Sequence, residues 1–155
     1  MKKMGLDWGE KRIGIALSDE LLTLAHPLNI IENSSRTKKI LKDIIQKEEV
    51  DEVIAGFPIT LRGEIGRQAV MVKKQVEETF RNLEVKLTFW DERFSTSHAE
   101  KILKRIGLDY KKGRQIRYKY KKKDRKIVKE LDNKIAACLI LQSYLDYLKG
   151  RIKKD

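Results

Sequence analysis

The chain has 155 residues, of which 37% are charged and 41% are hydrophobic, and its formal net charge is +12. This length fits one domain, residues 1–155, that can close a core without disulfides or a structural metal. No apolar run approaches the roughly 18 residues of a membrane span, so we expect a soluble protein without membrane partners. The N-terminus has no apolar signal segment and Cys138 is the only cysteine, which favours a reducing cytoplasm.

The basic surplus lies in the last third of the chain. Residues 1–99 contain 16 basic and 16 acidic residues, whereas residues 100–155 contain 19 basic and 7 acidic residues. Each Lys or Arg set against a phosphate releases counterions, so this asymmetry predicts nucleic acid as the partner. The alternative is the Lys- and Glu-rich surface of heat-adapted proteins, but such a surface would spread both signs evenly.

Residues 3–19 predict a β-hairpin with its turn at residues 9–11. Apolar side chains recur there with the period of two that half-buried strands require, at Met4, Leu6, Ile13, Ile15 and Leu17. Asp7 falls near the end of the first strand, where its carboxylate can face the edge of a sheet.

The next segments predict alternating strands and helices. A third strand at residues 24–31 contains Pro27, which indicates an edge position or a bulge. Ser34 or Ser35 is expected to cap a helix whose apolar stripe is Ile40, Leu41, Ile44 and Ile45. The continuous apolar run at residues 53–57 is typical of a parallel strand covered on both faces.

A second amphipathic helix is predicted between about residues 63 and 81, with the apolar face Ile65, Ala69, Val72, Val76 and Phe80. A fifth strand at residues 85–89 leads directly into Trp90, Asp91, Glu92 and Arg93. A third helix should begin with the capping box of Ser97 and Glu100 and stop at Gly107.

The end of the chain combines a basic segment and a closing helix. Residues 109–126 have no clean period, and the stretch 110–126 holds ten basic residues, so we expect a mobile arm or loop. An apolar-faced helix follows at about residues 127–149. Three antiparallel strands followed by alternating helices and strands predict an α/β fold, with a five-stranded mixed sheet flanked by helices.

Acidic residues at strand ends suggest a metal site. Asp7 ends the first strand, Glu92 follows the fifth, and an acid or amide stands at the start of the last helix. Paired Mg²⁺ or Mn²⁺ ions held by such carboxylates would activate a water and stabilise the leaving oxygen of a phosphodiester displacement. Taken singly, an acid at a strand end is more often a solvated turn or cap residue, so the metal site is predicted from the joint placement of the three.

Four stretches resemble, in this order, the motifs of the YqgF family of Holliday-junction-resolvase-like proteins. They are Gly5-Leu-Asp-Trp-Gly-Glu-Lys-Arg-Ile-Gly-Ile-Ala-Leu-Ser-Asp19, Gly56-Phe-Pro58, Asp91-Glu-Arg-Phe-Ser-Thr96 and Ile135-Ala-Ala-Cys-Leu-Ile-Leu-Gln-Ser-Tyr144. The resemblance implies a ribonuclease H-like fold in a bacterial cytoplasm. It also implies a divalent-metal-dependent nuclease, a phosphodiester hydrolase acting on precursor 16S ribosomal RNA at its 5′ end or on Holliday-junction-like branched DNA.

The family resemblance carries Asp7 and Glu92 over as metal ligands, but the third position is unusual. The family pattern has an Asp two residues before the Ile-Ala-Ala motif, where this chain has Asn133, with Asp132 one residue earlier. One residue turns a helix by about 100°, so the two side chains cannot point the same way. Either Asn133 binds a metal through its amide oxygen, or a distorted helix start lets Asp132 serve, and we prefer Asp132.

Basic residues around the predicted site are candidates for gripping phosphates, although exposed ion pairs are the alternative for some of them. These candidates are Lys11, Arg12, Arg62, Arg93, Lys111, Lys112, Arg114, Arg117, Lys119 and Lys121. Trp8 and Trp90 neighbour the acids and are expected to wall the site.

Three functions remain open on the sequence alone. A metal-dependent nuclease, as a monomer or homodimer, is the main hypothesis. A nucleic-acid-binding factor with a degenerate centre is the alternative that Asn133 motivates. The Asp7-Trp-Gly9 and Gly14 pattern also resembles the phosphate loop of actin-like ATPases, which need two lobes and a far longer chain.

Overall fold

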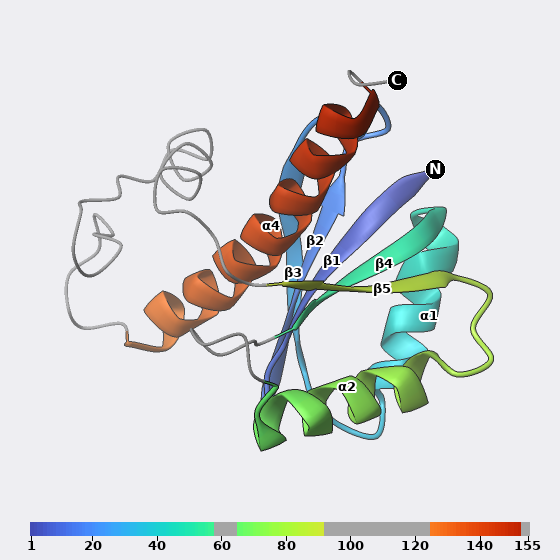
Figure 1. The fold of residues 1–155 in the computed structure, drawn as a ribbon. Helices are drawn as coiled ribbons and strands as arrows, with labels where there is room; N and C mark the ends of the chain where they lie inside the picture. The colour runs from blue at the N-terminus through green and yellow to red at the C-terminus, as the bar shows by residue number, and fades with distance from the viewer. Residues whose placement is uncertain (58–64, 92–124, 153–155) are drawn as a thin grey trace.

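The computed structural model describes residues 1–57, 65–91 and 125–152, with the side chains of the last helix described over residues 134–151. Five strands form one mixed sheet in the order β3-β2-β1-β4-β5 (Figure 1). They are β1 (Lys2–Trp8), β2 (Arg12–Ser18), β3 (Ala25–Glu32), β4 (Val50–Phe57) and β5 (Lys86–Asp91). The helices in the described ranges are α1 (Thr37–Lys47), α2 (Arg67–Phe80) and α4 (Arg125–Ile152).

The strand directions confirm the predicted mixed sheet. β1, β2 and β3 are antiparallel neighbours, whereas β4 is parallel to β1 and β5 is parallel to β4. The hairpin between β1 and β2 turns at residues 9–11, where the Gly9 amide donates to the Arg12 carbonyl at 2.9 Å. A Cβ on Gly9 would lie 2.4 Å from that carbonyl oxygen, so this tight turn requires glycine.

Both expectations for Pro27 are confirmed. β3 is an edge strand, so the missing N–H of Pro27 costs no interior ladder bond. The register with β2 shifts at this point, because Ile15 pairs with Asn29 while Ala16 pairs with Pro27. The extra residue, Leu28, forms a bulge in the edge strand.

One face of the sheet is covered by α1 and α2. Alternate residues of the strands, including Leu6 and Ile15, pack there against Leu41 of α1 and Val76 of α2. The start of α1 differs from the sequence prediction. The residue before the helix is Arg36 rather than a serine, and the Ser34 amide donates to Thr37 Oγ1 at 3.0 Å.

The second helix begins later than predicted. α2 begins at Arg67 after Gly66, and Ile65 lies before the helix with its side chain exposed. Ile65 therefore does not belong to the buried face, whereas Ala69, Val76 and Phe80 do. The period of the apolar residues continued past the physical start of the helix, which explains the wrong boundary.

The other face is covered by α4, which crosses the sheet in a single long helix (Figure 1). A Cβ placed on Gly5 of β1 would lie 2.7 Å from Leu141 Cβ and 2.8 Å from the Ala137 carbonyl oxygen. Glycine at this position therefore allows the helix to lie close to the central strand. Cys138 is buried in this layer, where burial raises its pKa to about 12 and suppresses its reactivity.

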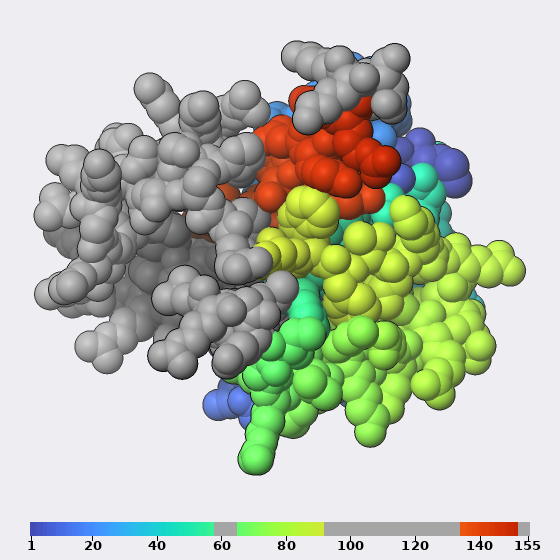
Figure 2. Space-filling view, viewed as in Figure 1, coloured from blue at the N-terminus to red at the C-terminus, as the bar shows by residue number. Residues whose placement is uncertain are grey.

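At its far end, α4 is fixed by the β2–β3 turn. Gln142 is fully buried, accepts the Ala25 amide at 2.8 Å and donates to the Thr23 carbonyl at 3.1 Å. Lys149 donates to the same carbonyl at 3.1 Å. Figure 2 shows α4 adjoining β5 on the visible face of the molecule.

Several predictions fall on residues that the structure does not describe. The helix expected at residues 97–107 lies outside the described ranges, as does the basic segment up to residue 124. Arg125 and Lys126, expected to end that arm, are the first residues of α4. No helix within the described ranges is long and apolar enough to cross a bilayer.

Candidate active site at the carboxyl ends of the central strands

Asp7 lies one residue before the end of β1, the central strand of the sheet, and pairs with Gly14 of β2. Side chains alternate along a strand, so Asp7 shares its face with Gly5, against which α4 packs. The parallel strands β1 and β4 end at the same edge of the sheet. This edge is where ligands bind in sheets with parallel central strands.

The Asp7 carboxylate is half-buried and lacks a partner among the described residues, which offer it neither a hydrogen bond nor an ion pair. Burial raises its pKa above the ordinary value for aspartate, because the desolvated charge is not compensated. A bound cation would supply that compensation. Asp7 therefore has the surroundings of a ligand or catalytic acid rather than of a structural ion pair.

Positions 132 and 133 were expected at the start of the last helix, but α4 begins at Arg125, so they lie about two turns inside it, and the backbone at position 133 is level with Asp7. The helix runs from the carboxyl toward the amino end of β1, because Ala137 contacts Gly5 and Tyr144 reaches Glu52, which pairs with Lys3. Position 133 is about one turn before Ala137 on the same side of the helix. One turn rises about 5.4 Å and two strand residues about 6.6 Å, so position 133 comes level with Asp7. Position 132 is rotated by about 100° from it.

The other two predicted metal-site positions remain predictions. Glu92 follows Asp91, the last residue of β5, and lies outside the described residues. The side chains of Asp132 and Asn133 are also outside them. Within the described ranges no three His, Cys, Asp or Glu residues are grouped so that they could hold a metal ion.

Of the predicted phosphate-binding residues, the described ones lie at the hairpin turn. Lys11 is exposed and Arg12 is half-buried at the end of the sheet that carries Asp7. The remaining candidates lie outside the described residues; they are Arg62, Arg93, Lys111, Lys112, Arg114, Arg117, Lys119 and Lys121.

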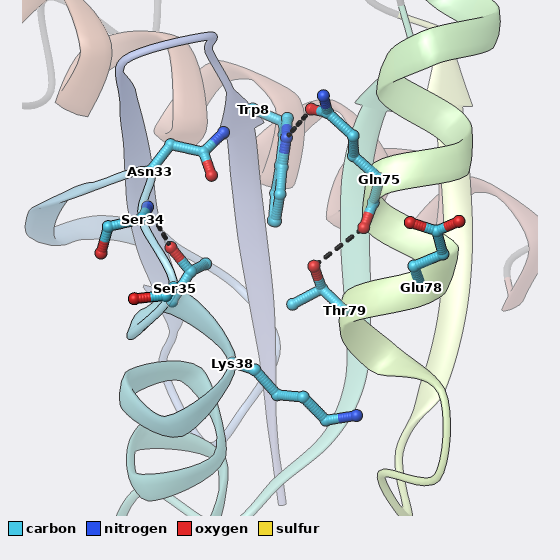
Figure 3. A pocket seen from close by; sticks show the side chains of 9 residues that line it. Trp8, Asn33, Ser34, Ser35, Lys38, Gln75, Glu78 and Thr79 are labelled. Atoms are coloured by element: carbon cyan, nitrogen blue, oxygen red, sulfur yellow. Dashed lines mark hydrogen bonds between the residues drawn. The ribbon is translucent and has the colours of Figure 1, made fainter.

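The expectation that Trp8 walls the same site as Asp7 is wrong. Adjacent residues of a strand face opposite sides, so Trp8 points toward α2, where its Nε1 donates to Gln75 Oε1 at 3.1 Å (Figure 3). Trp8 there lines a separate cavity of about 310 Å³ between α2 and the start of α1. Trp90 lies on the α4 face, where its Nε1 donates to Ser143 Oγ at 3.1 Å.

A second acid on the α4 face, Glu52, was missed by the sequence prediction. Its side chain is 4% exposed and lies near the amino end of β4. Oε1 accepts Tyr144 Oη at 2.8 Å and Thr88 Oγ1 at 2.7 Å, while Lys86 and Lys3 form ion pairs at 2.8 and 3.1 Å. Despite its desolvation, these contacts lower the Glu52 pKa from 4.5 to about 2. The available indication was an acid directly before the apolar run at residues 53–57.

Comparison with known proteins shows similarity to one family over nearly the whole chain. Residues 1–147 match the family model described as "RuvX: Holliday junction resolvase". A protein of Carboxydothermus hydrogenoformans named "Putative pre-16S rRNA nuclease" is 40% identical over 149 residues, covering 95% of this chain and 97% of that protein. A protein of the same name from Caldanaerobacter subterraneus is 36% identical over 152 residues, covering 97% and 99%.

Solved structures share the fold at low sequence identity. Thermus thermophilus RuvC aligns with a TM-score of 0.56 and 12% identity, covering 97% of each chain. The fowlpox virus Holliday junction resolvase aligns with a TM-score of 0.53 and 14% identity, covering 96% of this chain and 99% of the other. These alignments confirm the predicted resolvase-type, ribonuclease H-like architecture.

Proposed function

The chain belongs to the RuvX family of Holliday junction resolvases, and from this membership we infer that it is a nuclease that hydrolyses phosphodiester bonds in structured nucleic acid. The membership also confirms the resemblance to the YqgF family seen in the four motifs. One observation in the structure carries the proposal. It is the half-buried, unpaired carboxylate of Asp7 at the ligand-binding edge of a resolvase-type sheet.

We propose that Asp7 and Glu92, with Asp132 or Asn133, form the catalytic centre. The helix register supports Asn133 as the position nearest Asp7, because it is one turn before the contact of Ala137 with Gly5. An amide there would contribute an oxygen ligand but no charge. Asp132, which lies within α4, could contribute only if the helix departs from regular geometry around that position.

Oxygen ligands of this kind suit Mg²⁺ or Mn²⁺, and the uncompensated Asp7 carboxylate fits such an ion. A divalent cation bound there would supply Lewis-acid stabilisation of the phosphodiester and a more acidic water. Asp7 itself would orient that water and hold negative charge against the cation. Lys11 and Arg12 at the hairpin turn would neutralise the phosphates flanking the scissile bond.

The relatives named for precursor 16S rRNA suggest that RNA as the substrate, and the family description suggests branched DNA. Cleavage of both should therefore be measured, with labelled strands, in Mg²⁺ and after chelation. We expect Asp7→Asn to lower cleavage at least about a hundredfold, because charge stabilisation of the transition state is lost. Glu10→Gln, which removes an exposed acid from the adjacent turn, is the matched control and should retain activity.

Equal cleavage by wild type and Asp7→Asn would exclude this site. Cleavage that persists after chelation would exclude the metal while leaving the nuclease assignment standing.

A second function, nucleic-acid binding by a degenerate centre, is favoured by Asn133. An uncharged ligand level with Asp7 would weaken metal binding. This alternative predicts salt-sensitive binding of structured RNA with no metal-dependent turnover. Asn133→Asp would then create cleavage, whereas in an active nuclease based on Asp132 the same change would have little effect.

A further inference from the structure

Aromatic side chains of β5 and α4 form a cluster on the face of the sheet that carries Asp7. The Trp90 ring centroid lies 5.1 Å from that of Tyr144 and 5.0 Å from that of Tyr147. Ser143 fixes the indole by accepting its Nε1 proton at 3.1 Å. Trp90 is therefore held in one orientation, half-buried, with its ring directed along α4.

The outer part of this cluster is exposed and carries a positive charge. Tyr147 is 45% exposed, and the guanidinium carbon of Arg151 lies 5.8 Å from the Tyr147 ring centroid. Tyr147 and Arg151 are four residues apart, so they follow one another along one side of α4. We call Trp90, Tyr147 and Arg151 the aromatic strip. Its residues belong to β5 and α4, two elements that adjoin at the surface in Figure 2.

The aromatic strip begins on the same face of the sheet as Asp7. Leu6 of β1 is in register with Ala55 of β4, which is in register with Phe89 of β5, so Trp90 and Asp7 are at the same level. Two strand spacings separate them, about 10 Å. From there the strip leads away from Asp7, because Tyr147 is 14 residues after position 133, about 21 Å along α4. A nucleic-acid strand leaving the proposed centre would therefore pass Trp90 before Tyr147.

We propose that the aromatic strip stacks unpaired bases of a single-stranded nucleic acid that extends from the proposed active site, with Arg151 pairing its phosphate. This proposal rests on the nuclease function above and adds a single-stranded segment to the substrate. Aromatic side chains stack on any base, and arginine adds both cation–π and phosphate interactions.

Packing alone does not account for the strip. Tyr144 is already buried and bonded to Glu52, and it supplies the contact between α4 and the sheet. Tyr147 and Arg151 extend beyond that contact into solvent. The nearby acid of the helix, Asp146, is turned to the other side, where it accepts from Gln142 Nε2 at 3.0 Å. The outer part of the strip is thus positive, as a phosphate backbone requires.

The test measures binding of a fluorescently labelled single-stranded RNA by anisotropy in the Asp7→Asn background without divalent cations, so that nothing is cleaved. We expect Tyr147→Ala to weaken binding about tenfold, within the range for losing one base–aromatic stack. Tyr147→Phe should bind like the parent, because the ring remains. An abasic strand of equal length should bind the parent and Tyr147→Ala equally, because it has no bases to stack.

Arg151→Ala should weaken binding and reduce its salt dependence. Its matched control is Lys73→Ala on α2, which removes an equal charge and an equivalent cation–π pair, with Phe89, from the opposite face. A Trp8→Phe protein keeps Trp90 as its single tryptophan, and RNA should quench that fluorescence.

Binding unchanged in Tyr147→Ala, or weakened equally for RNA and abasic strands, would overturn the stacking site. So would an unaltered Trp90 emission at saturating RNA. Because cleavage is not measured, such a result would leave the Asp7 experiment and the nuclease proposal intact. Equal losses in Arg151→Ala and Lys73→Ala would mean that only overall charge matters.

Discussion

Two acids on the same face of the sheet, Asp7 and Glu52, have opposite surroundings. Both lie beneath α4, Asp7 near the carboxyl end of β1 and Glu52 near the amino end of β4. Glu52 is surrounded by two lysines and two hydroxyls, and its pKa falls to about 2. Asp7 has neither kind of partner among the described residues, and its pKa is raised.

The difference separates a structural carboxylate from a reactive one. Glu52 is satisfied by the protein itself and ties β1, β5 and α4 together through Lys3, Lys86 and Tyr144. Asp7 is held at a desolvated position with its charge uncompensated. A protein tolerates such a cost at positions where a ligand compensates it.

The largest expected effect on stability is at Glu52, the structural carboxylate. Glu52→Gln keeps the shape but removes the charge that Lys3 and Lys86 face, and it should lower the free energy of unfolding by about 3 kcal/mol in a urea titration. Glu48→Gln is the matched control, since it breaks the more exposed 2.9 Å pair with Lys2 and should cost less than about 1 kcal/mol. Equal losses of stability in Glu52→Gln and Glu48→Gln would show that the contacts of Glu52 contribute no more than an exposed ion pair does.

The same residue predicts an acid-dependent loss of stability. A lowered pKa in the folded state means that the contribution of Glu52 is complete above pH 4.5 and is lost as the pH falls toward 2. Unfolding free energies measured across this interval should fall more steeply for wild type than for Glu52→Gln, by about 3 kcal/mol in total. Parallel profiles for the two proteins would contradict the pKa assigned to Glu52.

The contact that sets α4 over Asp7 can be tested at Gly5. Gly5→Ala places a methyl group against Leu141 Cβ and the Ala137 carbonyl, so the helix must move, at a cost of about 2 kcal/mol. Nuclease activity should fall as well, because the part of α4 around position 133 shifts relative to Asp7. The control is Gly150→Ala. Gly150 lies in α4 with open space around it, so this change should be neutral or stabilising. If Gly5→Ala melts at the same temperature as wild type, α4 does not need glycine at position 5 in order to pack on β1.

The smallest effect on the free energy of unfolding is expected at Asp7, and it has the opposite sign. Asp7→Asn removes a desolvated charge and should raise stability at pH 7 by about 1 kcal/mol while activity is lost. Because the folded pKa is raised, the carboxylate destabilises the protein only as the pH rises above its ordinary value, so the gain should vanish in acid. Thermal melts at neutral and acidic pH measure this, and a destabilised Asp7→Asn at pH 7 would mean that the carboxylate has a structural partner.

Much of the fold could be predicted from periodicity. The period of two at residues 3–19 gave the hairpin, and Pro27 indicated the bulged edge strand, because both are local properties of the backbone. The errors concern helix boundaries. Periodicity did not show that α2 begins after Ile65, and it did not show that Arg36 rather than a serine precedes α1. The position of Asp7 was predicted, whereas Trp8 was assigned to the wrong face although alternation along β1 was already known.

By itself, the sequence determined the order of the strands and of the described helices, the family and the acid at the end of the first strand, since these depend on local pattern and on motifs. Only the tertiary structure decided which acid is compensated. The partners of Glu52 come from β1, β5 and α4, up to 92 residues away in the chain. Burial and charge pairing depend on such distant contacts, so Asp7 and Glu52 could be distinguished only once the chain was folded.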